Sequence, residues 1–131
     1  MPGVKTNQLY PVQLCNVNDV VNVYGSFELA GTGLDPVKVR GTGFVVTNVG
    51  GKFEIDFANF YAMVVSSCAS VTSTAAGVGD TLSANFRPFD SVNSKIVLDP
   101  IVGGVSNDAL VGPRISFNLA FHRSKTLATE Y

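Results

Sequence analysis

The sequence has few charged residues, a single histidine and no tryptophan. Charged side chains make up 15% of its 131 residues, compared with roughly 25% in an average soluble domain. A small monomeric domain exposes much of its surface and normally covers that surface with charge. Permanent subunit interfaces are depleted in charge, so we expect part of this surface to be buried against other chains. A surface of Ser, Thr, Asn and Gly, which are also abundant, is the alternative.

The sequence also lacks an excess of basic residues, because it has nine Lys and Arg and ten Asp and Glu. The basic residues are scattered, whereas a duplex-binding protein needs a basic stripe to contact phosphates. The longest apolar run, near residues 60–65, is far shorter than the ~20 residues that cross a bilayer. The first ten residues lack the apolar core of a secretory signal. We therefore expect no nucleic-acid partner, no membrane contact and synthesis in a cytosol.

The single histidine, His122, limits the available catalytic chemistry, because Ser-His-Asp and Cys-His sets both need a base. It follows Phe121 at the end of an alternating segment, on the expected polar side, which favours a structural or solvated histidine. No G-x-S-x-G elbow is present. Glu54 and Asp56 share one side of an expected strand, where solvation explains them better than a glycosidase pair. We expect no enzymatic activity, and a hydrolase that uses His122 is the least favoured hypothesis.

The sequence has only two cysteines and none of the usual metal-ligand patterns. Cys15 and Cys68 lie far apart in the sequence and define no redox compartment, and a bridge between them is an open alternative. Cys68 is expected to be a small buried side chain. Neither cysteine forms a zinc-ligand pattern with His122, and the loops near Asp80 and Asp108 are only a weak candidate for calcium. We expect no metal and no other cofactor.

What the sequence does contain is alternation of apolar and polar residues with a period of two, as in β-strands. The stretch Gly41–Val71 shows it best, because Phe53–Phe57 alternates and the preceding Gly50-Gly51 suits a tight hairpin. Phe44–Thr47 is rich in β-branched and aromatic residues. Phe60–Val71 is apolar on both faces at its start, which predicts a central strand. We expect three consecutive antiparallel strands here.

No segment has the apolar spacing of a helix, so we expect an all-β fold. About eight strands joined by Gly- and Asn-rich turns predict a single-domain antiparallel β-sandwich over residues 20–131, of jelly-roll or immunoglobulin-like type, with a small barrel as the alternative. Residues 1–19 are expected to form an N-terminal arm or an edge strand. Asp99-Pro100 is expected to end a strand, and residues 101–112 to form a long connection. The remaining expected strands are 19–29, 37–40, 82–86, 95–98 and 115–122.

Three kinds of residue are candidates for contacts with other subunits. Arginines beside strand segments can pair with a partner's carboxylates or stack on rings, and aromatic side chains can anchor an interface. Residues of the N-terminal arm can add a strand to a neighbour. Solvated strand ends and core packing are the respective alternatives for the arginines and the aromatics. The candidates are Leu9, Tyr10, Phe60, Tyr61, Arg87, Arg114 and Arg123.

Two regions of the sequence resemble a known class of proteins. G-T-G-F-V-V-T-N-V-G-G-K-F-E-I-D-F, the apolar F-Y-A-M-V-V-S-S-C-A-S-V that follows, and R-I-S-F-N-L-A-F-H-R-S near the end are similar to segments of small all-β virion proteins of tailed bacteriophages. In these proteins a glycine-bounded hairpin precedes a long strand, and the chain closes on a strand of this alternating kind. The resemblance spans Gly41–Ser124 and leaves residues 1–40 unmatched.

The resemblance implies a non-enzymatic protein that decorates and cements a capsid. Such a protein binds the major capsid protein and copies of itself, typically as a homotrimer, on the exterior of a virion assembled in the host cytoplasm. The alternative is a tail fibre or spike head that binds a host receptor glycan. That alternative predicts exposed aromatic residues in the loops at 30–36, 73–80 and 102–112, which contain none.

Overall fold

The computed structural model describes residues 20–73 and 81–123, and within them it contains nine strands and no helix. Residues 1–19, on which the prediction of an arm or edge strand falls, lie outside the described residues. The strands are β1 (Val20–Ala30), β2 (Val37–Arg40), β3 (Phe44–Val49), β4 (Lys52–Phe57), β5 (Met63–Thr72), β6 (Leu82–Phe86), β7 (Lys95–Val102), β8 (Val105–Ser106) and β9 (Val111–His122).

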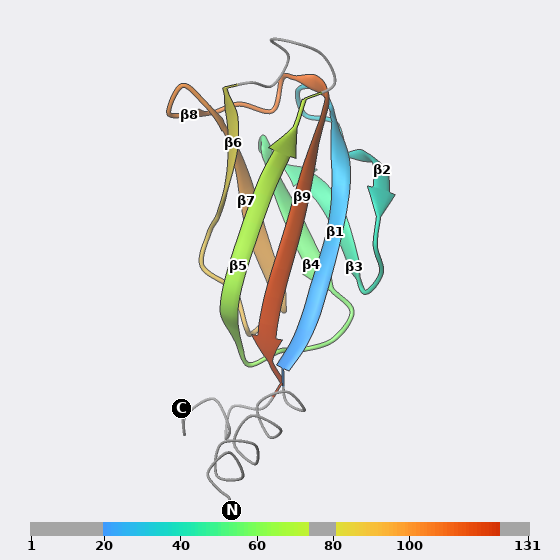
Figure 1. Ribbon diagram of the computed structural model, residues 1–131, viewed down its shortest axis with the longest axis vertical. Helices are drawn as coiled ribbons and strands as arrows, with labels where there is room; N and C mark the ends of the chain where they lie inside the picture. Colours follow the sequence, from blue (N-terminus) through green and yellow to red (C-terminus); the bar gives the residue numbers. More distant parts are fainter. Residues whose placement is uncertain (1–19, 74–80, 124–131) are drawn as a thin grey trace, which may run out of the picture.

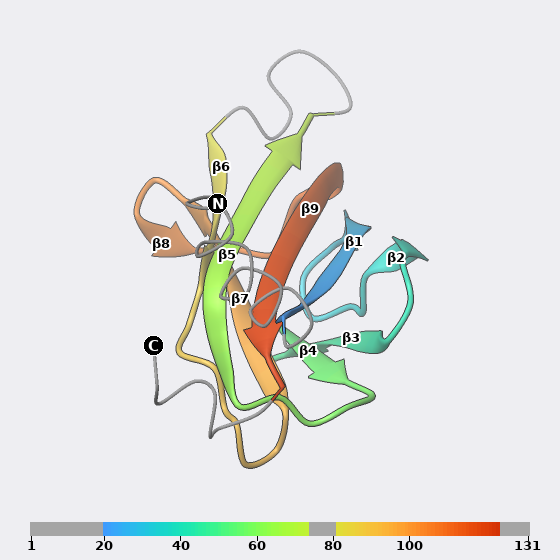
Figure 2. The ribbon, with the colours of Figure 1, turned by 60° about the horizontal axis from the view of Figure 1, so that its bottom comes forward.

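The strands form two antiparallel sheets, as the sequence predicts for a β-sandwich. One sheet has the order β2-β1-β9-β5, and the other has the order β3-β4-β7-β6, with the short β8 paired to β7. Figures 1 and 2 show one sheet in front of the other, with the long strands β1, β9 and β5 side by side. The strand beyond the expected eight is β8, which lies in the segment expected to be a long connection.

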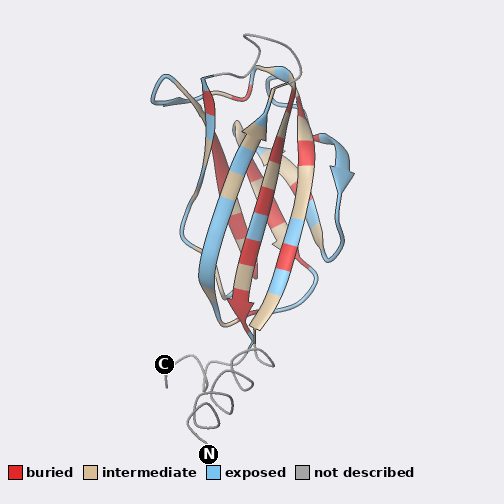
Figure 3. Ribbon diagram, in the orientation of Figure 1, coloured by how far each residue is buried: buried red, intermediate tan, exposed pale blue. Residues whose placement is uncertain are grey.

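The core lies between the sheets and is built from the alternating residues of the strands. Ile115, Phe117, Leu119 and Phe121 of β9 are each at most 3% exposed, because a period of two points all four side chains to the same face. They meet side chains of the facing sheet, where Phe121 packs edge-on against Phe57 with ring centroids 4.9 Å apart. The buried stripes of both sheets are visible in Figure 3.

The predicted hairpin at Gly50-Gly51 is confirmed. Val49 pairs directly with Lys52, so the loop between β3 and β4 has two residues. Gly50 and Gly51 adopt φ angles of 61° and 85°, the left-handed conformation at both positions that a two-residue turn of this kind needs. The two strands that flank the hairpin are confirmed as the antiparallel pair β3 and β4, but the third predicted strand is wrongly placed, because it lies in the other sheet.

β5 is an outer strand of the other sheet, not a central strand beside β4. The apolar residues that suggested a central position, Phe60 and Tyr61, precede β5 and belong to the connection that crosses from one sheet to the other. The strand itself is dominated by small residues, and most of it is exposed. Cys68, expected to be buried, is exposed in the middle of this strand.

Two further expectations are corrected near the end of the chain. β7 does not end at Asp99-Pro100 but runs on to Val102. The carbonyl of Pro100 accepts a hydrogen bond from the Asn107 amide at 2.8 Å. The N–H and C=O of one strand residue point to the same side, and the C=O of Pro100 points to Asn107, away from β6. Pro100 therefore lacks an N–H only on that side, and the hydrogen bonds between β7 and β6 are intact.

The second corrected expectation concerns His122, expected on the solvent-exposed side of its strand. It is 8% exposed at the end of β9. Its partners across the two ladders are Val20 of β1 and Met63 of β5.

Candidate interaction surface

The outer face of the sheet β2-β1-β9-β5 carries an extended area without charge. The three long strands are in register, so their outward side chains form rows across β1, β9 and β5. Tyr24, Asn118 and Cys68 form the middle row, and all three are exposed. We call this area the uncharged face, and its residues are Asn22, Tyr24, Ser26, Ser66, Cys68, Ser70, Ser116, Asn118 and Ala120.

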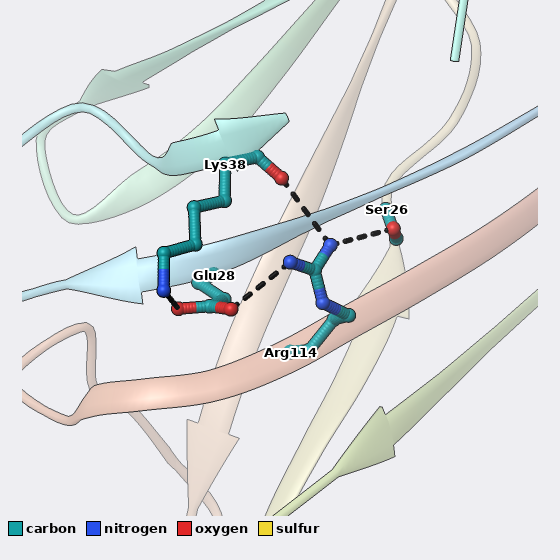
Figure 4. A network of polar contacts seen from close by, with 4 residues as sticks. All are labelled: Ser26, Glu28, Lys38 and Arg114. Carbon is teal, nitrogen blue, oxygen red and sulfur yellow. Dashed lines mark hydrogen bonds and ion pairs between the residues drawn. The ribbon is translucent and has the colours of Figure 1, made fainter. Parts of the chain in front are cut away.

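One end of this sheet does carry charge, and there the charges pair with one another. Arg114 of β9 donates from Nη2 to Oε2 of Glu28 at 2.9 Å and from Nη1 to Oγ of Ser26 at 2.7 Å. Nη1 also donates to the carbonyl of Lys38 on β2 at 3.2 Å. The ammonium of Lys38 lies 3.5 Å from Glu28. Figure 4 shows Arg114 reaching across β1 to β2. Arg114, a candidate for contact with a partner's carboxylate, thus ties together three strands of its own sheet.

Arg87, the second arginine candidate, is also engaged within the chain. Its guanidinium lies 2.7 Å from Oδ2 of Asp99, a carboxylate that is 1% exposed. Ser106 donates to the other oxygen of Asp99 at 2.7 Å. A buried charge needs such partners, so Arg87 and Ser106 hold β8 and the end of β6 on β7.

The two aromatic candidates, adjacent in sequence, have opposite environments. Phe60 is 72% exposed. Tyr61 is 6% exposed and stacks on Phe121 with ring centroids 4.5 Å apart. Tyr61 therefore belongs to the core, which corrects its place among the interface candidates. Phe60 lies just before β5, where Met63 and Val65 are also exposed.

Arg123 is exposed just beyond the end of β9, on the side of the molecule where β5 begins. Leu9 and Tyr10 lie outside the described residues. The structure therefore brings Phe60 and Arg123 to one end of the sheet, whereas Arg87 pairs with Asp99 and Arg114 with Glu28. The exposed strand β5 is the feature that the candidate set missed. Its ten residues contain no Asp, Glu, Lys or Arg, and that lack of charge was the available signal.

A polar cluster joins two loops and the end of strand β3 by way of Asp108, which is 8% exposed. Its Oδ2 accepts hydrogen bonds at 2.8 Å from the amide N–H of Gly33 and from Nδ2 of Asn48. The Gly33 bond and then the Asn48 bond lower the pKa of Asp108 below its ordinary value, against the opposing effect of burial. Asn48 also donates its backbone N–H to Asp35 at 2.8 Å. The carboxylate of Asp108 thus serves as a structural link.

The weak calcium candidate gains no support from this cluster. In the described ranges, no group of three His, Cys, Asp or Glu side chains is arranged to hold a metal ion. Asp80, the other half of the candidate, lies outside those ranges. The same part of the chain contains no helix long and apolar enough to cross a membrane.

Comparison of the chain with protein-family models, with curated proteins and with solved structures finds no match. The arrangement of the residues themselves is therefore the basis for a function. It offers an uncharged face, a long exposed strand at the border of that face, and ion pairs within the chain at one end of the sheet.

Proposed function

We propose that this chain is a non-enzymatic structural subunit of a bacteriophage virion that decorates and cements the capsid. It binds the major capsid protein and copies of itself on the exterior of the shell. The observation that carries this proposal is the uncharged face, which extends across the three long strands β1, β9 and β5. The resemblance of Gly41–Ser124 to phage virion proteins supports the same function.

The physical argument concerns the cost of removing a surface from water. Burying a charge that lacks a partner costs several kcal/mol, whereas small hydroxyl and amide side chains can pair across an interface. Of the charges that border the uncharged face, Arg114 and Glu28 neutralise each other at 2.9 Å, while Arg40 lies opposite Ser26 on the outer strand β2. Apolar area contributes roughly 25 cal/mol per Å², so an interface near ~1,600 Å² is sufficient when it is repeated over a shell.

A co-sedimentation experiment with shells that lack this protein tests the proposal. The wild-type chain should sediment with the shells and raise their resistance to heat. Asn118→Lys, which places a charge at the centre of the uncharged face, should lower the affinity for shells at least tenfold, because a buried unpaired charge opposes docking. Val45→Lys, at a position 62% exposed on β3 of the other sheet, is the matched control and should bind normally. Wild-type protein that ignores the shells, or Asn118→Lys protein that binds them equally well, contradicts the proposal.

A second function, binding of a host receptor glycan by a tail fibre or spike head, is favoured by one observation. Tyr24 is 65% exposed on the uncharged face, beside a shallow hollow lined also by Ser26, Arg40 and Ser116. An exposed ring beside hydroxyl and guanidinium donors suits a sugar. A glycan array should then give a signal that Tyr24→Ala abolishes, and an array without signal removes this alternative.

A further inference from the structure

β5 presents a long free edge of backbone. It is the last strand of its sheet, and in the described part of the chain its paired neighbour is β9 alone. The strand has ten residues, which makes it the longest of the four outer strands β2, β3, β5 and β6. Backbone N–H and C=O groups along such an edge are a template for another strand. We call this side of Met63–Thr72 the β5 edge.

The β5 edge lacks the features that protect other edges from pairing. Natural edges are blunted by shortness, charge or proline. β2 has four residues and carries Lys38 and Arg40, and β6 has five residues followed directly by Arg87-Pro88. β3 also lacks charge, but it has only six residues and its edge is engaged where the Asn48 N–H donates to Asp35. β5 contains no charged residue, no proline and no glycine. Its one irregularity is a bulge, where the register with β9 shifts between Val64 and Ser66.

The middle of β5 is uncovered on both of its faces. Residues 65–68 are all exposed, although successive side chains of a strand point to opposite faces. Ser67 is opposite the buried Leu119 of β9, so it shares the core-facing side of the sheet, yet it is exposed. β5 therefore projects beyond the facing sheet at this point, as the pale-blue run along β5 in Figure 3 shows.

We propose that the β5 edge pairs antiparallel with the β5 edge of a second copy of this chain, about a two-fold axis. The two four-stranded sheets then join into one continuous sheet. The proposal rests on the proposed function in that it names the contact by which copies of the subunit bind each other. A second copy fits the edge because two identical uncharged strands place no like charges opposite each other, whatever their register. Two-fold dimers are also the commonest closed assembly, and this two-fold contact takes the place of the homotrimer that the resemblance implies.

Symmetry and exposure together select the register. A two-fold axis perpendicular to the sheet keeps the outer face of both copies on the same side, so paired residues must share a face. Adjacent residues of a strand point to opposite faces, so residue i cannot pair with residue i+1 of the second copy. The axis must therefore pass through a residue that pairs with the same residue of the second copy. We place the axis between the bulge and Thr72, which lies opposite the charged Arg114 of β9, in the mostly exposed stretch 66–70. Its centre is Cys68, which lies opposite its own equivalent in the second copy.

This register has a measurable consequence. Directly opposite residues of antiparallel strands have Cα atoms about 4.5–5.5 Å apart, which is within the range that a disulfide bridges. Ser70 is two residues from the axis, so its equivalent in the second copy is roughly 14 Å away at 3.4 Å per residue. A thiol at position 68 should therefore cross-link to its equivalent, and a thiol at position 70 alone should not.

Cysteine cross-linking in the full-length chain tests the register. In a Cys15→Ser background, mild oxidation should link the Cys68 thiols of two copies into a covalent dimer at twice the chain mass of 13.8 kDa. Cys68→Ser with Ser70→Cys should stay uncrosslinked, and addition of Ser66→Cys to that variant should restore the dimer, since residues 66 and 70 face each other. Equal cross-linking at positions 68 and 70, or none at 68, overturns the proposed register.

A charge placed on the axis tests the contact itself by solution mass. Cys68→Lys puts two ammonium groups opposite each other and should raise the dimer dissociation constant by about a hundredfold, while Cys68→Ser should leave it unchanged. Position 68 is exposed in the monomer, so the melting temperatures of both variants should stay close to that of the wild type. A wild-type monomer at every concentration, a trimer, or a Cys68→Lys dimer overturns the inference.

The shell-binding experiment separates this inference from the proposed function. A wild-type dimer that depends on Cys68 but ignores shells contradicts the proposed function and leaves the two-fold contact standing. A wild-type monomer that still sediments with shells contradicts the two-fold contact and leaves the proposed function standing. Asn118 lies directly opposite Cys68 on the neighbouring strand, so the variant that separates the two tests is Tyr24→Lys, on the uncharged face but two strands from the β5 edge. It should bind shells weakly and remain a dimer.

Discussion

At the scale of single residues, the polar side chains that matter for stability are those that join distant segments. Asp108 accepts hydrogen bonds from Gly33, 75 positions away, and from Asn48, 60 positions away. Asn48 in turn accepts a bond on Oδ1 from the amide of Gly51 at 3.0 Å, which fixes the end of the hairpin. Loss of one partner leaves a part-buried donor without its acceptor, and that costs about 1–3 kcal/mol.

The lowered pKa of Asp108 gives a prediction with a definite sign. In the folded state the pKa of Asp108 lies below its ordinary value of 3.8. The ionised carboxylate therefore contributes fully to the free energy of unfolding at pH values well above 3.8, and this contribution is lost as the pH falls through the folded pKa. Asp108→Asn should lower the free energy of unfolding by about 1–2 kcal/mol at pH 7, and the deficit should shrink in acid. Urea unfolding at neutral pH and near pH 2.5 measures this, with Asp56→Asn on β4 as control; an unchanged deficit contradicts the assignment.

The neighbours Phe60 and Tyr61 provide an internal comparison of exposed and buried aromatics. Tyr61→Ala should lower the free energy of unfolding by about 3–5 kcal/mol, because it removes a buried ring stacked on Phe121 and leaves a cavity. Phe60→Ala should change it by less than about 0.5 kcal/mol. Chemical denaturation of the two variants side by side checks this. Equal effects would mean that the environments of the two rings differ less than the structure indicates.

At the scale of elements, β2 depends on contacts made across β1. All four of its residues are exposed, so it has little apolar burial of its own. Its pairing with β1 is interrupted by an irregularity between Ser26 and Glu28. Arg114 bridges this irregularity by holding Glu28, Ser26 and the carbonyl of Lys38 at once. We infer that the guanidinium keeps this short strand in the sheet.

Arg114→Lys tests this role, because an ammonium cannot reproduce the planar fork that reaches three acceptors. The free energy of unfolding should fall by about 1–2 kcal/mol, and hydrogen exchange should quicken at the amides of β2. Lys38→Ala removes only a side chain that is 67% exposed and 3.5 Å from Glu28, so it should cost less than about 0.5 kcal/mol. Unchanged exchange in β2 after Arg114→Lys would show that other contacts hold the strand.

The elements that could be predicted from the sequence are those whose local pattern alone decides the structure. β9 alternates cleanly over its whole buried length, and the φ angles of Gly50-Gly51 are available to glycine at little cost. β5 could not be placed in this way, because Phe60 and Tyr61 look like strand residues until the crossing between the sheets is known. The continuation of β7 through Pro100 depends on which side of the strand faces β6, and that follows from the topology.

The candidate site was harder to predict than the fold, for a related reason. Arg87 and Arg114 were candidates for pairing with a partner's carboxylates, but the carboxylates with which they pair belong to this chain. Glu28 lies 86 positions from Arg114 and reaches it only through the pairing of β1 with β9. Spacing along a sequence cannot reveal such a partner. The low charge content, by contrast, is a property of the whole sequence and needs no topology.

At the scale of the whole molecule, charge and exposure are distributed unevenly. Four ion pairs in the described residues tie strands or neighbouring segments together, while the uncharged face and the β5 edge are left without charge. Exposed apolar side chains add to this imbalance near the start of β5, with Phe60 at 72% and Val65 at 50%. Such a surface supports the proposal that the domain contacts other subunits and is not a monomer.

The most direct test of this account is the mass of the full-length chain in solution, measured by sedimentation equilibrium over a wide range of concentration. The account predicts a reversible dimer of the 13.8 kDa chain that Cys68→Lys converts to a monomer and Cys68→Ser does not. A single chain mass at every concentration, with no response to either substitution, would contradict it.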